Sequence, residues 1–241
     1  MGLVVVAGGL REKIIVALDT DAHTALGLAR SLQGRADWLK VGMTLFYAEG
    51  PGIVARLRDM GFRIFLDLKL HDIPHQVEGA AREIAKLGCS MMTVHASGGV
   101  EMMRAAMQGA YAGSRECGID TPGIVAVTVL TSMDERSLGQ TGVSKPVAEQ
   151  VHGLAGLARE SGVQGIVCSP HEARAMRELL GPEALVVTPG VRPSWASADD
   201  QARIATPGEA IAAGASHVVI GRPITGAEEP GSAMERIAEE A

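Results

Sequence analysis

The sequence predicts a single-domain (β/α)8 barrel. Eight short apolar runs alternate with helical segments along the 241 residues. Strands that are joined by helices pair in parallel and are buried on both faces, so their runs are continuously apolar. Hydrophobic residues make up 46% of the chain, and no segment resembles a linker. The chain can therefore bury one large core around a single barrel.

Each predicted strand is a short, mostly apolar run. The third run, for example, begins after Gly61 and ends in charged residues before Pro74. The eight predicted strands cover residues 13–19, 38–42, 63–69, 91–96, 123–130, 165–169, 185–190 and 217–221.

The segments between these runs have helical spacing or helix-ending residues. Leu26, Ala29 and Leu32 recur at the helical period. Gly88 and Gly162 each end a helix, because glycine readily takes the left-handed conformation of a C-terminal cap. The predicted helices cover residues 24–32, 52–60, 75–87, 100–115, 145–161, 170–180, 207–213 and 231–240.

A doubly wound open sheet is the alternative architecture. Its dinucleotide-binding version requires G-x-G-x-x-G after the first strand. Here the turn is DTDAH, from Asp19 to His23. The barrel is therefore the favoured prediction.

Composition limits the function classes. The net charge is −6 and no basic run occurs, which argues against a nucleic-acid-binding surface. Three cysteines without metal-type spacing predict a reducing, cytoplasmic setting. Residues 2–10 are apolar but too few to span a bilayer, and no positive residue precedes them as in a signal peptide. We expect residues 1–12 to be an N-terminal extension, partly disordered or an extra strand, and residues 13–241 to form the barrel.

Polar residues follow the predicted strand ends, where active sites of such barrels lie. Lys40, Asp67, Lys69 and Asp72 alternate in sign, and burying them for packing alone would cost too much. Asp67 and Lys69 are two apart on a strand, so they point to the same face. The full predicted ring is Asp19, Lys40, Asp67, Lys69, Asp72, His95, Thr128, Thr131, Ser132, Ser169, Thr188, Gly221 and Arg222.

The charged residues suggest a decarboxylation. Lys69 between two carboxylates should stay protonated, because nearby opposite charges favour the ammonium form. It would act as a general acid rather than as a Schiff-base nucleophile. Asp67 would repel an anionic substrate group until that group left, and Lys69 would stabilise and then protonate the resulting carbanion.

The last two strands predict a phosphate site. Barrels often bind phosphate after strands seven and eight, where this chain has PGVR, ending at Arg192, and IGRP, around Gly221 and Arg222. Gly221 allows close backbone approach and Arg222 can make a bidentate contact. Between Pro189 and Thr206 runs a long connection that contains Gln201, and a lid is the favoured interpretation over disorder.

The segment DLKLHDIP, residues 67–74, resembles the D-x-K-x-x-D-I-P signature of the orotidine 5'-phosphate decarboxylase family, whose members make UMP. Further motifs follow in the family's order. They are ALD at Asp19, LKVG at Lys40, VHASGG at His95, AVTVLTS up to Ser132, VTPGVRP and VIGRPIT. The resemblance covers residue 13 to the C terminus, and so many motifs in order make it specific.

The resemblance implies a metal-free, cofactor-free homodimeric barrel that decarboxylates orotidine 5'-monophosphate (OMP). It implies that Lys69 donates the proton to C6 and that Asp67 lies against the leaving carboxylate. Lys40 would orient this network and contact the ribose with Asp19. Asp72 would be lent to the partner subunit's active site.

The resemblance also implies the remaining substrate contacts. Thr131 and Ser132 would meet the pyrimidine, and Ile73 and Gln76 would also contact the substrate. Residues that would hold the phosphate under the lid are Arg192, Gln201, Gly221 and Arg222. Many members have Thr where this chain has Gln76, so we expect altered contacts there rather than loss of activity.

Two other functions remain as alternatives. The related sugar-phosphate branch stabilises an enediolate with Mg2+, but that chemistry would need a further acidic ligand where this chain has Leu39 and Lys40. A non-catalytic nucleotide-binding protein would gain nothing from burying Asp67 beside an anion.

His71 and His75 resemble a zinc pair in their spacing. They straddle a strand end and a proline, so helical ligand geometry fails and we expect no metal site there.

Overall fold

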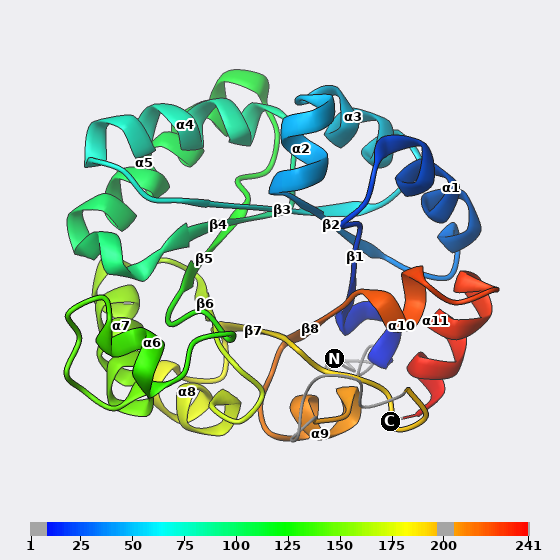
Figure 1. Ribbon diagram of the computed structural model, residues 1–241. Coiled ribbons are helices and arrows are strands. Elements are labelled where there is room, and N and C mark those ends of the chain that lie inside the picture. Colours follow the sequence, from blue (N-terminus) through cyan, green and yellow to red (C-terminus); the bar gives the residue numbers. More distant parts are fainter. Residues whose placement is uncertain (1–8, 197–204, 241) are drawn as a thin grey trace, which may run out of the picture.

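The computed structural model describes residues 9–196 and 205–240. Eight parallel strands close into a barrel in chain order, with β8 pairing back onto β1. Figure 1 looks along the barrel and shows the strands as an inner ring inside the helices. The strands are β1 Ile14–Ala17, β2 Trp38–Gly42, β3 Arg63–Leu70, β4 Met91–His95, β5 Gly123–Val127, β6 Gly165–Val167, β7 Leu185–Pro189 and β8 His217–Ile220. The predicted fold class is confirmed.

The helices alternate with the strands as the sequence predicts. They are α1 Ala22–Leu32, α2 Met43–Glu49, α3 Gly52–Asp59, α4 Pro74–Lys86, α5 Gly99–Cys117, α6 Glu135–Gly139, α7 Val147–Ser161, α8 Ala173–Leu180, α9 Pro207–Ala212, α10 Arg222–Thr225 and α11 Pro230–Glu239. The sequence analysis missed α2, α6 and α10. Each has seven residues or fewer, which is too short for a clear helical period.

Several strands end earlier than predicted. The fifth apolar run was expected to be extended through residue 130, but β5 ends at Val127. Thr128 still donates its N–H to the Val167 carbonyl, after which the chain leaves the sheet. The apolar residues beyond the strand end, Val129 and Leu130, line a cavity instead of pairing. An apolar run therefore predicts too long a strand at the C-terminal end of the barrel, where apolar residues can line a cavity instead.

The core has two layers, separated by the sheet. On β3, Phe65 points into the barrel, while Ile64 and Leu66 pack outwards against the helices. The same period of two on the other strands fills the barrel interior with Ile15, Ala17, Trp38, Phe65, Met91, Val125, Val187 and Val219. Inward positions further along each strand reach the C-terminal rim.

A 3-10 helix, η1 Leu10–Lys13, precedes β1. Leu10 is buried, and Arg11 forms an ion pair with Asp37 at 3.0 Å. These residues belong to the predicted N-terminal extension, whose residues 1–8 lie outside the described part of the chain. The boundary between extension and barrel stays a prediction.

Candidate active site

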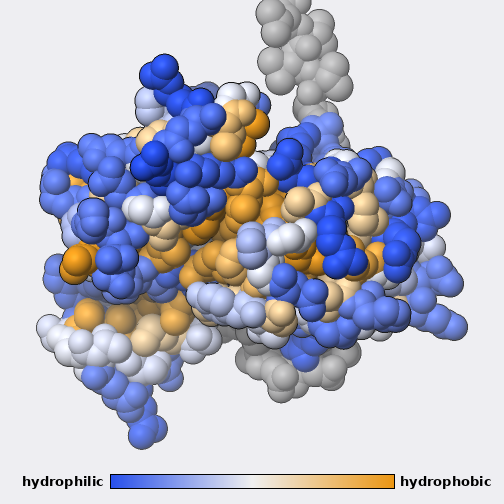
Figure 2. Space-filling view, turned by 90° about the horizontal axis from the view of Figure 1, so that it is seen from above, coloured by the Kyte–Doolittle hydropathy of each residue, from blue (hydrophilic) through white to orange (hydrophobic). Residues whose placement is uncertain are grey.

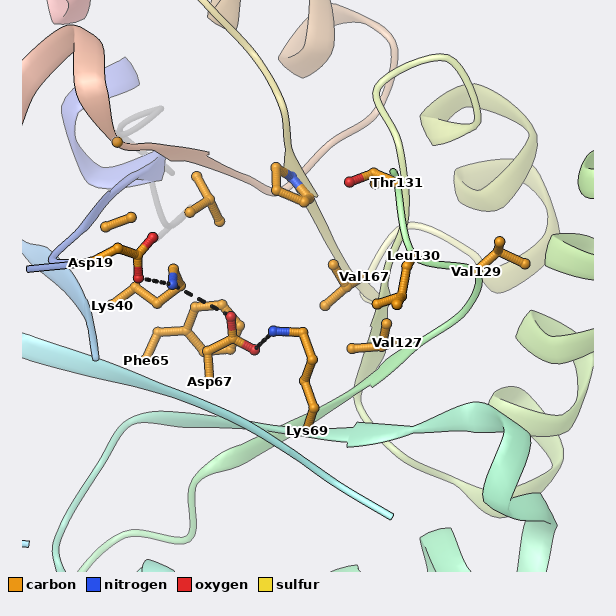
Figure 3. A pocket seen from close by; sticks show the side chains of 14 residues that line it. Asp19, Lys40, Phe65, Asp67, Lys69, Val127, Val129, Leu130, Thr131 and Val167 are labelled. Carbon is orange, nitrogen blue, oxygen red and sulfur yellow. Dashed lines mark hydrogen bonds and ion pairs between the residues drawn. The ribbon is translucent and has the colours of Figure 1, made fainter. Parts of the chain in front are cut away.

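A cavity of about 320 Å³ opens at the C-terminal end of the barrel. Its lining is part apolar and part charged, and Figure 3 shows the charged side chains gathered on one side. The lining residues are Ala17, Asp19, Lys40, Phe65, Asp67, Lys69, Val127, Val129, Leu130, Thr131, Val167, Pro189, Val219 and Gly221. On β3 the inward positions run from Phe65 in the core to Asp67 and Lys69 in the cavity, which is the shared face that the alternation predicts.

Four charged side chains form a continuous chain of ion pairs across the cavity (Figure 3). Lys40 Nζ lies 2.8 Å from Asp19 Oδ1 and 3.6 Å from Asp67 Oδ2. Lys69 Nζ lies 2.8 Å from Asp67 Oδ1. Asp67 is therefore held between two ammonium groups, and charges alternate from Asp19 to Lys69.

The pairing allows two charges to lie almost out of water. Lys40 is 8% exposed and Asp67 is 9% exposed. An unpaired ion at such a site would cost on the order of several kcal/mol, so each charge needs its partners. The site is therefore fixed electrostatically before any substrate enters.

The backbone is distorted where Lys69 joins the site. The pairing of β3 with β4 shifts register between Leu66 and Leu70, and Lys69 has φ 52°. Among the described residues it is the one non-glycine residue with positive φ. This left-handed conformation costs roughly 1–2 kcal/mol, and strain of this kind gathers at functional sites.

Thr93, in the middle of β4, supports both catalytic candidates. Its Oγ1 accepts the Lys69 N–H at 2.8 Å and donates to Asp67 Oδ1 at 3.1 Å. The first bond satisfies a backbone donor that the distorted strand leaves without a regular partner. The sequence analysis missed Thr93, although its position two residues from both Met91 and His95 places it on the inward face.

Gly42 is a second residue that the sequence analysis did not single out. A Cβ at this position would lie 2.8 Å from Asp19 Oδ1 and 3.0 Å from Lys40 Nζ. The Asp19–Lys40 pair therefore needs the empty space that glycine leaves.

Asp72 lies outside the cavity. It is exposed, its Oδ1 accepts the Ile73 N–H at 2.7 Å, and it borders a separate groove with Gln76 and Tyr47. No ion pair joins Asp72 to Lys69 within the described part of the chain. The expectation that Lys69 lies between Asp67 and Asp72 therefore does not hold within one chain.

The predicted pyrimidine contacts divide in a similar way. Thr131 lines the cavity beside Leu130, whereas Ser132 is exposed and not part of the lining. Thr128 and Thr188, also predicted at the rim, are buried and bond to the carbonyls of Val167 and His217. These two threonines belong to the barrel wall.

Three of the predicted phosphate residues, Arg192, Gly221 and Arg222, lie just beyond the ends of β7 and β8. Gly221 lines the central cavity, and Arg192 and Arg222 line a neighbouring cavity of about 430 Å³ with Trp195. Gln201 lies outside the described residues. Arg192 follows β7 and Arg222 begins α10, so the fold brings two cations to this second cavity.

His95 ends β4 beside His71, with ring centroids 5.4 Å apart. Burial lowers the pKa of His95, and the nearby His71 and Lys69 lower it further. His95 therefore adds no stable positive charge next to Lys69 at neutral pH.

Residues 12–237 match the family described as "Orotidine 5'-phosphate decarboxylase / HUMPS family". The chain belongs to this family. The resemblance inferred from the motifs is thereby confirmed.

Individual relatives agree with the family match. Orotidine 5'-phosphate decarboxylase of Paramagnetospirillum magneticum is 47% identical over 225 residues, covering 93% of this chain and 96% of that protein. The enzyme of that name from Anaeromyxobacter dehalogenans is 49% identical over 228 residues, covering 94% and 97%. The crystal structure of orotidine 5'-phosphate decarboxylase from Lactobacillus acidophilus has a TM-score of 0.85 at 40% identity, covering 95% of this chain and 98% of that one.

The described residues contain neither a metal-binding cluster nor a membrane-spanning helix. Within residues 9–196 and 205–240, no three His, Cys, Asp or Glu side chains lie close enough together to hold a metal ion. Within the same ranges, no helix has the length and apolar character needed to cross a membrane.

Proposed function

We propose that this chain decarboxylates OMP to UMP, with Lys69 as the proton donor and without a metal or cofactor. The observation that carries the proposal is the Lys69–Asp67 ion pair, which lies in the cavity where a barrel of this kind does its chemistry. Membership of the orotidine 5'-phosphate decarboxylase / HUMPS family supports the choice of substrate.

Asp67 would oppose the substrate carboxylate. Its side chain is nearly buried and fixed by Lys40, Lys69 and Thr93, so it cannot turn away when an anion approaches. Repulsion between the two carboxylates raises the energy of the bound substrate and disappears when carbon dioxide leaves. Because the repulsion is relieved as the bond to carbon dioxide breaks, it lowers the activation barrier for decarboxylation.

Lys69 would supply the proton. When the bond between C6 and the carboxylate breaks, its electron pair stays on C6, and the Lys69 ammonium stabilises that charge. A proton then passes from Nζ to C6, forming UMP, and the neutral amine regains a proton from solvent. Asp67, at 2.8 Å, keeps the ammonium aimed into the cavity.

Other residues would orient the nucleotide. Lys40 and Asp19 form a pair at the mouth that can bind the ribose hydroxyl groups. Thr131 and Ser132 would contact the base. The phosphate would lie near the ends of β7 and β8, held by Arg192, Gln201, Gly221 and Arg222.

The complete site would require a homodimer, with Asp72, Ile73 and Gln76 facing the partner's cavity. Tyr47 is 72% exposed and Ile73 is 63% exposed. Exposed apolar side chains that gather into a patch are typical of protein–protein interfaces. Figure 2 views the side of the molecule that carries α2, α3 and α4, where apolar side chains run across the middle of the face.

The three free cysteines agree with a cytoplasmic enzyme.

The function is tested by following OMP absorbance in the presence of a chelator. Substrate should be converted to UMP at an undiminished rate when the chelator is added. A chain that leaves OMP intact but decarboxylates a keto-sugar phosphate when Mg2+ is present would favour the sugar-phosphate branch. A folded chain that binds UMP but leaves OMP intact would favour a nucleotide-binding protein.

The shared site is tested by subunit mixing. Asp72→Ala and Lys69→Ala chains should each be inactive, and their heterodimer should recover activity because one of its two sites has both residues intact. Heterodimers that are demonstrably formed but inactive would contradict the proposal.

A further inference from the structure

We propose that the C-terminal helix α11 positions the phosphate arginines, with Arg236 and Glu240 holding the segment of residues 192–196 in place. This inference rests on the proposed function, because it assigns a role to residues outside the expected substrate contacts.

The segment after β7 is docked onto the end of α11 by two side chains. The Ser194 N–H donates to Glu240 Oε1 at 2.8 Å. The Arg236 guanidinium lies over the Trp195 ring, 4.4 Å from its centroid, and Trp195 also packs against the main core. A cation–π contact and a charge-assisted hydrogen bond thus fix neighbouring residues of the segment.

This docking sets the position of Arg192. The Arg192 N–H donates to the Ala205 carbonyl at 3.1 Å, which joins the two ends of the long connection. The Ala196 N–H donates to the Pro193 carbonyl, which makes residues 193–196 a compact turn. Because the turn is short and anchored at Ser194 and Trp195, Arg192 can move little unless the contact with α11 is released.

The same helix also braces the second arginine. Arg222 begins α10, and α10 packs directly against α11. Figure 1 shows these two helices side by side next to β8, in orange and red. Arg192, Trp195 and Arg222 line one cavity. Helix α11 therefore supports both parts of the chain that supply these residues, the segment 192–196 and the start of α10.

Neither Arg236 nor Glu240 lines that cavity or the central one. They are positioning residues, and their loss should weaken binding of the phosphate group without touching the reacting carbon. The affinity difference between UMP and uridine isolates this effect, because the two ligands differ only in the phosphate.

The test compares the double variant Arg236→Met, Glu240→Ala with wild type. The Michaelis constant for OMP should rise about three- to ten-fold while kcat stays within about two-fold, the pattern of lost uniform binding. UMP affinity should fall by a similar factor and uridine affinity should not change.

Glu235→Gln is the matched control. Glu235 lies on α11 next to Arg236, but it pairs with Arg35 at 3.1 Å instead of contacting residues 192–196. This variant should leave the Michaelis constant and the UMP affinity unchanged.

Three results would overturn the inference. They are an unchanged UMP affinity in the folded double variant, an equal loss for UMP and uridine, and a wild-type chain that does not prefer UMP over uridine. A wild type that binds UMP but does not convert OMP would contradict the proposed function alone, because the binding comparison still decides the role of α11.

Discussion

At the C-terminal end of the barrel, Lys40 and Asp67 are nearly buried, and each faces opposite charges at 2.8–3.6 Å. At the N-terminal end, His217 is largely buried against Trp38, with ring centroids 5.3 Å apart. Burial there, with the nearby positive charges of Arg63 and Lys13, lowers the pKa of His217 to about 4. At the C-terminal end, the mouth of the barrel, buried charges are stabilised by ion pairs. At the N-terminal end, the base of the barrel, the buried His217 is neutral instead.

This difference shows where the fold permits charge chemistry. The inward positions of each strand begin in the apolar base and end at the polar mouth, so one set of strands builds both environments. Removing a charge at the mouth should change activity. Changing the base should alter only the stability of the fold.

The largest effect should come from Lys69→Ala. Loss of the general acid should lower kcat by at least about 10³-fold, equivalent to about 4 kcal/mol, while UMP binding remains measurable. Steady-state kinetics with OMP and titration with UMP check this result. Turnover near the wild-type rate would refute the role of Lys69 as the proton donor.

His217→Phe should change the pH dependence of stability at the N-terminal end of the barrel. Because the folded pKa lies below the usual value of about 6.5, an unfolded chain takes up a proton between pH 6.5 and about 4 that the folded chain does not. Folded wild type therefore has its full stability above pH 6.5 and loses roughly 3 kcal/mol as the pH falls to about 4.

The phenylalanine variant keeps a ring against Trp38 but cannot take a proton. As the pH falls, wild type should therefore lose stability relative to the variant. The free energies of unfolding of the two proteins, measured with urea at each pH, check this result. OMP turnover at neutral pH should match wild type. A difference that stays constant from pH 7 to pH 4 would contradict this prediction.

Arg222→Ala should weaken phosphate binding at the mouth. A charge-assisted hydrogen bond contributes about 2 kcal/mol, so the Michaelis constant for OMP should rise about 30-fold with kcat little changed. If the Michaelis constant does not change, Arg222 does not hold the phosphate.

Gly42→Ala should give the smallest effect, with about a ten-fold loss in kcat/KM. The added Cβ would push Asp19 and Lys40 apart, and small displacements in a catalytic array lower the rate. Gly153→Ala is the control, since a Cβ there meets no atom within 4 Å. Equal kinetics for the two variants would show that the Asp19–Lys40 geometry is unimportant.

The sequence predicted the charged residues that line the central cavity because strand ends and alternation are local properties. Asp67 and Lys69 share a face since they are two apart on a strand. Gly42 and Thr93 were missed for a different reason, because their importance depends on which side chains from other strands approach them. The three short helices were missed because few residues give a weak helical period.

Sequence by itself determined the barrel, the inward faces of its strands and the charged residues at its mouth. Those features follow from the order of apolar runs and from the period of two along each strand. Only the tertiary structure decided that Asp19 rather than Asp72 completes the row of charges within one chain, and that α11 supports the segment after β7. Both depend on contacts between residues far apart in sequence, and no local pattern encodes such contacts.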